Sequence, residues 1–552
     1  MSAANANIAR HLAVMAAAQA ATPALKIPCG RTAAGDIDYL VLTFAELDAE
    51  VGAWHARLAA AGVQRGDRTL VMVRQGLPLI ASAFALFRLG AVPVVIDPGM
   101  GLRSFLACVA RSRPRALVGI PLARMLSRVF WKTFSTVAVR VPAPNSLTAR
   151  LANRESKIEN RKFEDAVCAA DELAAILFTS GSTGAPKGVC YEHGMFDAQV
   201  RLIRDTYGIK PGEIDLPMLP IFALFNPALG MTTIVPEINP RRPADVDPAK
   251  IVQAIQQERV TNSFGSPTLW NKIGDHCRAK HLTLPTLRRV LCAGAPVPAA
   301  LWRHSHAFLS RGQLHSPYGA TEALPIATVS ADDIASASGR GACVGTAVAE
   351  VEIKIIAITD APIATLADAR ELPRGEIGEI IVRGPVVTKC YDALPDATAL
   401  AKIFDSQPAV SGGIWHRMGD CGYLDADGLL WFCGRKAERV ETASGTLHTE
   451  PCEQAFRAHK LGLRCALIGL GERGNQRPAM VFELNLPDSR ACRALARELR
   501  ALALAHEYTA GIKTFYFHPR FPVDVRHNAK IHRLALAKWA ATAKGFQSDP
   551  KR

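Results

Sequence analysis

Residues 176–189 read Ile-Leu-Phe-Thr-Ser-Gly-Ser-Thr-Gly-Ala-Pro-Lys-Gly-Val, and this stretch decides the fold class and the chemistry that we expect. An apolar run, typical of a buried strand, leads into a loop rich in hydroxyl groups and glycines. Glycines let backbone N–H groups curl around an anion, and the hydroxyl groups and a lysine add donors and charge. The loop is a candidate phosphate-binding site formed by Thr179, Ser180, Gly181, Ser182, Thr183, Gly184 and Lys187.

Two better-known nucleotide motifs are excluded. The loop lacks the spacing G-x-x-x-x-G-K-[S/T], so it is not a Walker A loop. Gly469 to Gly474 does match G-x-G-x-x-G after an apolar run, but another strand-like run, 479–484, follows it. A dinucleotide site needs a helix N-terminus at that place. We therefore interpret 469–474 as a loop between two strands.

The segments before this loop alternate between helix and strand patterns. Thr43 is followed by Glu46 and by apolar residues at helical spacing, which predicts a capped helix. Residues 70–73 and 91–96 are short apolar runs typical of buried strands, and 77–89 between them is helical. Helices that alternate with continuous apolar strands predict an α/β fold with layered, parallel sheets.

The length of 552 residues suggests several lobes. Residues 423–432 form two strand-like runs joined by Asp-Gly, which predicts a hairpin, and the chain after it is strongly basic. Residues 150–165 are rich in charge and are interpreted as a surface linker. We predict a large multi-lobed N-terminal domain, 1–436, and a small, hinged α+β C-terminal domain, 437–552.

Composition sets outer limits on the function. The 49% of hydrophobic residues excludes wholesale disorder, collagen and coiled coil. The net charge of +15 favours anionic ligands. Thirteen cysteines without a C-x-x-C pair indicate a reducing compartment, the cytoplasm. The apolar run 216–238 is interrupted by Pro217, Pro220, Pro227 and Pro236, so we interpret it as strand and loop beside an apolar pocket and not as a transmembrane helix.

Together with the 176–189 loop, later motifs make the chain resemble the adenylate-forming superfamily of acyl-CoA synthetases, luciferases and adenylation domains. The resemblance runs through nearly the whole chain, and the motifs follow in the family's order. They are Ala293-Gly-Ala-Pro296, Tyr318-Gly-Ala-Thr-Glu322, Gly375-Glu-Ile-Gly-Glu379, Arg417-Met-Gly-Asp420 and Gly434-Arg435.

This resemblance implies ATP and Mg²⁺ as cofactors and a role for each matched residue. Glu322 would hold Mg²⁺, and Lys530 in the run 524–531 would be the adenylation lysine, although Ala529 stands where the family has glycine. The hinge would lie at Ala437. The adenine and ribose would contact Gly294, Ala295, Pro296, Tyr318, Gly319, Thr321, Asp420 and Arg435.

Three departures from the family concern the second half-reaction. The family usually has Asp or Lys at the hinge, where this chain has Ala437. Cys452 stands where a Glu is usual in the block that helps line the pantetheine tunnel. Ala223 stands where many relatives carry His. These departures argue against coenzyme A as the acceptor and leave adenylation untouched.

Finer details resemble one branch, the β-lactone synthetases of bacterial long-chain olefin biosynthesis. These details are Asp97-Pro-Gly-Met-Gly101, Cys190-Tyr-Glu-His193 and His527-Asn-Ala-Lys530. The resemblance implies a 2-alkyl-3-hydroxy fatty acid whose carboxylate is adenylated and whose β-hydroxyl then displaces AMP. It also implies an assembly with the pathway's thiolase, ketone reductase and β-lactone decarboxylase.

Two assignments remain open at this point. His193 is a candidate base for the β-hydroxyl, although a His at this place is common in the wider family. Phe222 and Phe225 are candidates for a pocket that takes the alkyl chains, but aromatic residues at this spacing also suit an ordinary core.

Two other functions agree with parts of this sequence. A fatty acyl-CoA synthetase or fatty acyl-AMP ligase differs only in the acceptor. A nucleic-acid-binding protein would use the positive charge, but the basic residues are dispersed and no binding module is present, so we expect no nucleic acid.

Overall fold

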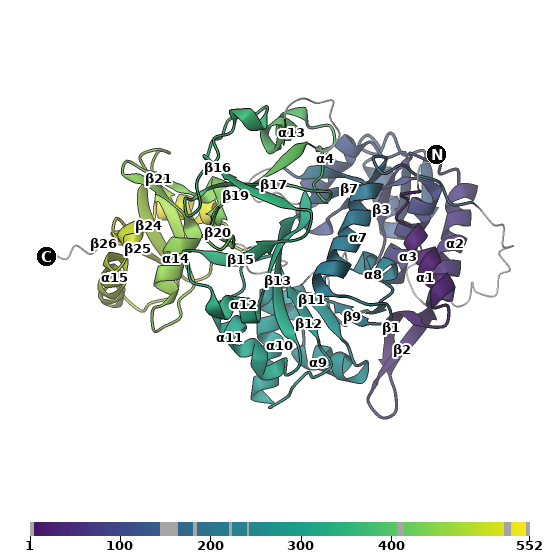
Figure 1. Cartoon of the computed structure of the whole chain (residues 1–552), viewed down its shortest axis with the longest axis horizontal. Helices are drawn as coiled ribbons and strands as arrows, with labels where there is room; N and C mark the ends of the chain where they lie inside the picture. Colours follow the sequence, from purple (N-terminus) through teal and green to yellow (C-terminus); the bar gives the residue numbers. More distant parts are fainter. Residues whose placement is uncertain are drawn as a thin grey trace.

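A computed structural model describes residues 5–143, 164–179, 185–219, 223–239, 242–405, 413–523 and 531–547. Most of the predicted linker, 150–163, lies outside these residues. Figure 1 shows three regions: the sheet and helices near the N-terminus, a long central sheet, and a smaller body at the C-terminal end.

The first region is a layered α/β unit built around a sheet of six described strands. The sheet order is β6-β5-β3-β4-β7-β8, and every neighbouring pair is parallel except β7 and β8. The strands are β3 (Arg68–Met72), β4 (Val92–Ile96), β5 (Ala116–Gly119), β6 (Val139–Pro142), β7 (Leu173–Thr179) and β8 (Lys187–Glu192). The helices are α1 (Arg10–Ala18), α2 (Phe44–Ala60), α3 (Leu77–Leu89), α4 (Leu102–Ser112), α5 (Pro121–Val129) and α7 (His193–Tyr207), with a 3₁₀ turn at Pro98–Met100.

The central sheet has a parallel half and an antiparallel half. Its order is β16-β17-β19-β20-β15-β14-β13-β12-β11-β9-β10-β1-β2, with β18 on β19, and the change occurs at β13. The parallel half contains β1 (Pro23–Arg31), β9 (Ile214–Pro217), β10 (Thr232–Ile234), β11 (Asn262–Gly265), β12 (Arg289–Cys292) and β13 (Gln313–Ala320), with β2 (Ile37–Thr43) antiparallel at its edge.

The antiparallel half is β14 (Ala323–Ser330), β15 (Ala342–Ala347), β16 (Glu352–Ile356), β17 (Gly378–Arg383), β18 (Lys402–Phe404), β19 (Ile414–Leu424) and β20 (Leu430–Arg435). The helices of this region are α8 (Asn226–Leu229), α9 (Pro248–Gln257), α10 (Pro267–Ala279), α11 (Ala299–Phe308), α12 (Ala331–Ser336) and α13 (Pro395–Ala401). The 3₁₀ turns are Pro243–Asp245 and Leu366–Asp368.

The C-terminal region is a small α+β body. A hairpin of β21 (Val440–Thr442) and β22 (Gly445–Leu447) precedes a sheet of β23 (Cys465–Leu470), β24 (Arg477–Glu483), β25 (Thr514–His518) and β26 (Phe546–Gln547). Its helices are α14 (Thr449–Arg457), α15 (Ser489–Leu504) and α16 (Arg533–Ala540), with a 3₁₀ turn at Glu507–Thr509. Separate apolar clusters fill the two faces of the sheet, with α14 and α15 contributing to one cluster and α16 to the other.

These sheets confirm the predicted α/β class with layered sheets and a small α+β body at the C-terminus. The predicted hairpin is β19–β20, and residues 469–474 join two antiparallel strands, as expected. The domain boundary at 436/437 falls in the 3₁₀ turn Lys436–Glu438, and the division into two domains stays a prediction.

The described part of 216–238 holds β9, β10 and also the short helix α8, which the prediction of strand and loop did not include. Prolines interrupt the run as expected, and Pro227 lies in the first turn of α8. Among the described residues, no helix is long and apolar enough to cross a membrane.

Candidate active site

A cavity of about 2170 Å³ lies where the three regions meet. Its walls include residues of α3, β7 and α7, the β13–β14 hairpin, β19 and β20, and parts of α14 and α16. Such a junction between packed units is a common place for a ligand site.

The structure brings most of the described candidate residues together around this cavity. Residues 180–184, Phe222 and Lys530 lie outside the described residues, and only the backbone of Thr179, at the end of β7, is described. Ile531, which follows Lys530 in sequence, lines the cavity. The candidates that line it are Lys187, Phe225, Gly294, Ala295, Pro296, Tyr318, Gly319, Thr321, Glu322, Asp420, Arg435 and Ala437.

Lys187 and Glu322 mark one end of the cavity, which we call the phosphate end. Tyr391 links them: its hydroxyl donates to Glu322 Oε1 at 2.8 Å, and the Lys187 ammonium lies 4.7 Å from its ring centroid. The backbone carbonyl of Glu322 accepts from the amide and hydroxyl of Thr388, at 2.9 and 3.0 Å. Tyr391 therefore holds the Glu322 carboxylate, while Thr388 fixes the Glu322 backbone.

Glu322 fits a Mg²⁺ site of the kind completed by a nucleotide. Among the described residues, no group of three or more His, Cys, Asp and Glu side chains could hold a metal by itself. Mg²⁺ in nucleotide sites usually takes one or two carboxylates together with phosphate oxygens. One positioned carboxylate beside the cationic Lys187 meets that requirement.

Asp420, Tyr318 and Arg435 mark the nucleoside end. Asp420 on β19 lies opposite Arg435 on β20, and Arg435 Nη1 donates to Asp420 Oδ1 at 2.7 Å. The hydroxyl of Tyr318 donates to Asp420 Oδ2 at 2.7 Å. Burial, with the Asp420 charge, raises the pKa of Tyr318 well above its usual value, so the phenol stays protonated. Asp420 is thus a fixed acceptor, suited to hydroxyl groups of a ribose.

An apolar wall adjoins the phosphate end. It is formed by α3, the inner strands of the six-stranded sheet, and α7, and Tyr191 and Phe196 stack within it at 4.8 Å. Representative members are Val71, Ala83, Phe84, Val95, Leu177 and Phe196. Phe225 also lines the cavity, as predicted for an alkyl pocket.

His193 is not among the residues that line the cavity. Its ring is 1% exposed, lies edge-on to Phe87 with centroids 6.1 Å apart, and accepts from the Ile8 amide at 3.4 Å through Nδ1. Burial lowers its pKa to about 4. The candidate role as base for a substrate hydroxyl requires access to substrate, and this buried position does not support it.

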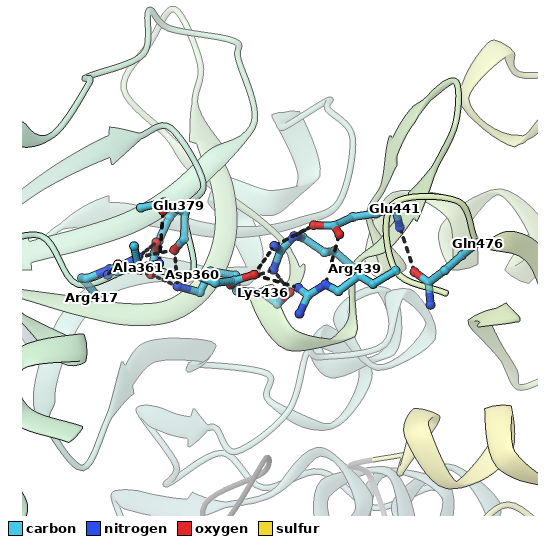
Figure 2. A network of polar contacts seen from close by, with 10 residues as sticks. Asp360, Ala361, Glu379, Arg417, Lys436, Arg439, Glu441 and Gln476 are labelled. Atoms are coloured by element: carbon cyan, nitrogen blue, oxygen red, sulfur yellow. Dashed lines mark hydrogen bonds and ion pairs between the residues drawn. The ribbon is translucent and has the colours of Figure 1, made fainter. Parts of the chain in front are cut away.

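Two sets of ion pairs flank the predicted hinge, and Figure 2 draws the set around Glu379. Glu379 is fully buried and binds Arg417 through both oxygens, at 3.1 and 2.6 Å, and also Lys436 at 2.9 Å. On the other side of Ala437, Glu438 pairs with Arg533 of α16 at 2.9 Å. Lys436 therefore connects the turn to the central sheet, and Glu438 connects it to the C-terminal body.

Comparison with known proteins decides the family. Residues 21–392 match the family described as "AMP-binding enzyme". The chain belongs to the AMP-binding enzyme family.

Two curated relatives match this chain over nearly its whole length. It is 44% identical to the olefin beta-lactone synthetase of Xanthomonas campestris, over 97% of each chain. It is also 44% identical to the protein of that name from Stenotrophomonas maltophilia, over 97% of this chain and 98% of that one.

Solved structures share the fold at low identity. MatB from Rhodopseudomonas palustris with bound ATP has a TM-score of 0.76 at 23% identity, covering 98% of this chain and 99% of MatB. MenE from Bacillus subtilis in complex with AMP has a TM-score of 0.74 at 21% identity, with the same coverage.

Sequence reasoning missed several residues that line this cavity or support its walls. Tyr391 and Thr388 lie in no motif that we singled out, because their roles depend on a contact with Glu322 across the fold. Gln199 of α7 also lines the cavity and was missed, since a single polar residue in an amphipathic helix has no sequence signal. The departure Cys452 is 1% exposed in α14, and burial raises its pKa to about 12, so it is an inert core thiol.

Proposed function

We propose that this AMP-binding enzyme is an ATP-dependent, AMP-forming β-lactone synthetase of olefin biosynthesis. Its substrate is a long-chain 2-alkyl-3-hydroxy fatty acid. The near-full-length identity to two olefin beta-lactone synthetases carries the proposal. The cavity supports the proposal, because one continuous space joins a polar end suited to a nucleotide and an apolar wall suited to alkyl chains.

In the first half-reaction, a carboxylate oxygen of the fatty acid attacks the α-phosphorus of ATP, and the bond to pyrophosphate breaks. Lys187 at the phosphate end is a donor to the phosphates. From the sequence we add the loop 179–184 as further donors and Lys530 as the proposed adenylation lysine. Glu322 would hold Mg²⁺, which neutralises charge on the phosphate oxygens. Asp420 and Arg435 orient the ribose, while residues 294–296 and Tyr318 contact the adenine.

In the second half-reaction, the β-hydroxyl oxygen attacks the acyl carbon and the carbon–oxygen bond to AMP breaks. AMP leaves with the bonding electron pair, the hydroxyl proton passes to water, and a four-membered lactone forms. Nucleophile and electrophile belong to one bound molecule, which makes the closure intramolecular and offsets part of the ring strain. No external thiol takes part, in keeping with Ala437, Cys452 and Ala223 at positions where thioester-forming relatives differ.

The apolar wall is proposed to hold the alkyl chains, with Phe225 and Phe222 in the same pocket. Aliphatic and aromatic side chains from three elements contribute to it, as burial of a long chain requires. We further propose that the enzyme works in the cytoplasm beside the thiolase, the ketone reductase and the β-lactone decarboxylase of the pathway.

The test is incubation of the protein with ATP, Mg²⁺ and the hydroxy acid, followed by product analysis. We expect AMP, pyrophosphate and β-lactone. Lys530→Ala should lower pyrophosphate release by orders of magnitude while ATP binding remains, and an unchanged rate would remove Lys530 from the mechanism. Acyl-CoA as the main product would instead identify a fatty acyl-CoA synthetase.

A further inference from the structure

Gln199 is a polar side chain in the apolar wall of the cavity. It lies in the middle of α7, is 1% exposed, and has two wall residues, Phe196 and Val200, as close neighbours in sequence. A buried amide surrounded by apolar groups is unfavourable unless its donors and its acceptor find partners.

Within the described residues, the Gln199 amide bonds the backbone carbonyl of Leu324 and the side chain of Tyr191. Gln199 Nε2 donates to the backbone carbonyl of Leu324 at 3.0 Å. A carbonyl oxygen can only accept, so this bond fixes which way the amide is turned. The other end, Oε1, is buried and has no hydrogen-bond partner in the described part of the chain.

The amide lies where the apolar wall meets the phosphate end. Leu324 follows Glu322 by two residues, and both line the cavity together with Gln199. The neighbouring Tyr191, which stacks on Phe196 in the wall, donates its hydroxyl to the carbonyl of Thr321. A fatty acid whose chains lie on the wall and whose carboxylate reaches the phosphate end has its second and third carbons at this junction.

We propose that Gln199 Oε1 accepts a hydrogen bond from the 3-hydroxyl of the substrate; this rests on the proposed function. A free acceptor requires a donor, and in a 2-alkyl-3-hydroxy carboxylate the hydroxyl is the only donor. The ribose and adenine donors of ATP belong to the nucleoside end around Asp420. The amide takes no proton: it binds the O–H hydrogen and leaves an oxygen lone pair free to face the acyl carbon. Gln199 is therefore a specificity-determining residue.

The experiment compares two acids, a 2-alkyl-3-hydroxy acid and the 2-alkyl acid without the hydroxyl, in ATP–pyrophosphate exchange. This readout follows the reversible formation of the acyl adenylate, a step that both acids can undergo. We expect the unmodified enzyme to prefer the hydroxy acid at least tenfold in kcat/KM. In Gln199→Leu this ratio of kcat/KM should fall close to one, because kcat/KM for the hydroxy acid decreases. The yield of lactone per pyrophosphate released should fall as well.

Phe196→Leu is the matched control, since it changes the same wall without altering a polar atom; it should affect both acids alike. Exchange with the acid that lacks the hydroxyl shows that the Gln199→Leu variant is folded. If that variant does not fold, Gln199→Met is used in its place. A preference that survives in the variant, or is absent from the unmodified enzyme, overturns the inference. Failure of the unmodified enzyme to form a lactone would instead overturn the proposed function.

Discussion

At the scale of single residues, Tyr391 connects parts of the site that are far apart in sequence. It touches Lys187 through its ring and Glu322 through its hydroxyl, and both of those residues come from recognisable motifs. A hydrogen bond to a carboxylate is stronger than one between neutral groups, so its loss should leave Glu322 less firmly placed.

Tyr391→Phe should therefore weaken adenylation by about 10- to 100-fold and raise the Mg²⁺ concentration needed for half-maximal pyrophosphate exchange. The measurement is a Mg²⁺ titration of the exchange rate. Tyr207→Phe is the control, because its hydroxyl bonds Thr328 Oγ1 at 3.0 Å and the residue does not line the cavity. A Mg²⁺ titration identical to that of the unmodified enzyme would contradict the role of Tyr391.

Cys390 lies beside Tyr391 in sequence and is exposed. A hydrogen bond from the Cys190 thiol lowers the pKa of Cys390 to about 7, with a further contribution from the Lys402 charge. Cys29 is also exposed, but slight desolvation and the neighbouring Asp38 raise the pKa of its thiol. The thiolate is the reactive form, and the lower pKa gives Cys390 more of it at neutral pH.

Iodoacetamide at pH 7 should modify Cys390 before Cys29, as peptide mass spectrometry would show. Cys190→Ala removes the donor, so it should raise the pKa of Cys390 and slow its alkylation relative to Cys29. Equal rates for the two thiols, or no change in Cys390 on Cys190→Ala, would show that the pair does not interact.

At the scale of elements, His193 ties the first turn of α7 to α3 and to the N-terminal segment. The neutral ring accepts from Ile8, and its pKa of about 4 lies below the usual value near 6.5. The unfolded chain thus binds a proton at a higher pH than the folded chain does. This histidine costs no stability above pH 6.5 and destabilises the fold as the pH falls from 6.5 toward 4.

The expected loss from this one group is up to about 3 kcal/mol at pH 4, at about 1.4 kcal/mol for each pKa unit. His193→Gln keeps a side-chain acceptor and should make stability less dependent on pH between 6.5 and 4. Thermal unfolding of both proteins across this range is the measurement. Parallel pH profiles would show that His193 contributes nothing to the dependence.

Elements were more predictable from sequence than the contacts between them. The capping box was read from Thr43 and Glu46, and the structure has both of its hydrogen bonds at the start of α2, at 3.2 and 2.9 Å. The short helix α8 was missed because it spans only Asn226–Leu229, too short for a periodic pattern. His193 lay in a recognised segment, yet only the packing of Phe87 and Ile8 revealed that its ring faces the core.

At the scale of the whole molecule, motifs spread from 187 to 435 meet at one cavity, and the resemblance predicted that meeting. The bonds that position them could not be predicted, because Tyr391 to Glu322 and Gln199 to Leu324 depend on how distant strands and helices are brought together. The same holds for the polar network around Glu379, which joins the central sheet to the hinge (Figure 2).

Glu379→Gln tests that network. It removes a fully buried carboxylate that pairs with Arg417 and Lys436, leaving two cations without their charge partner. The expected loss of stability is about 3–5 kcal/mol. The control is Glu352→Gln at the exposed pair with Arg383, where a change within about 0.5 kcal/mol is expected. Equal melting temperatures for the two variants would contradict the importance of the hinge network.

The central claim is that the substrate's own hydroxyl is the acceptor of the activated acyl group. The most direct measurement is product analysis by NMR and mass spectrometry after incubation with ATP, Mg²⁺ and a long-chain 2-alkyl-3-hydroxy acid, with and without coenzyme A. The account predicts β-lactone, AMP and pyrophosphate in equal amounts whether or not coenzyme A is present. Two results together would contradict this claim: acyl-CoA as the product when coenzyme A is present, and no lactone when coenzyme A is left out.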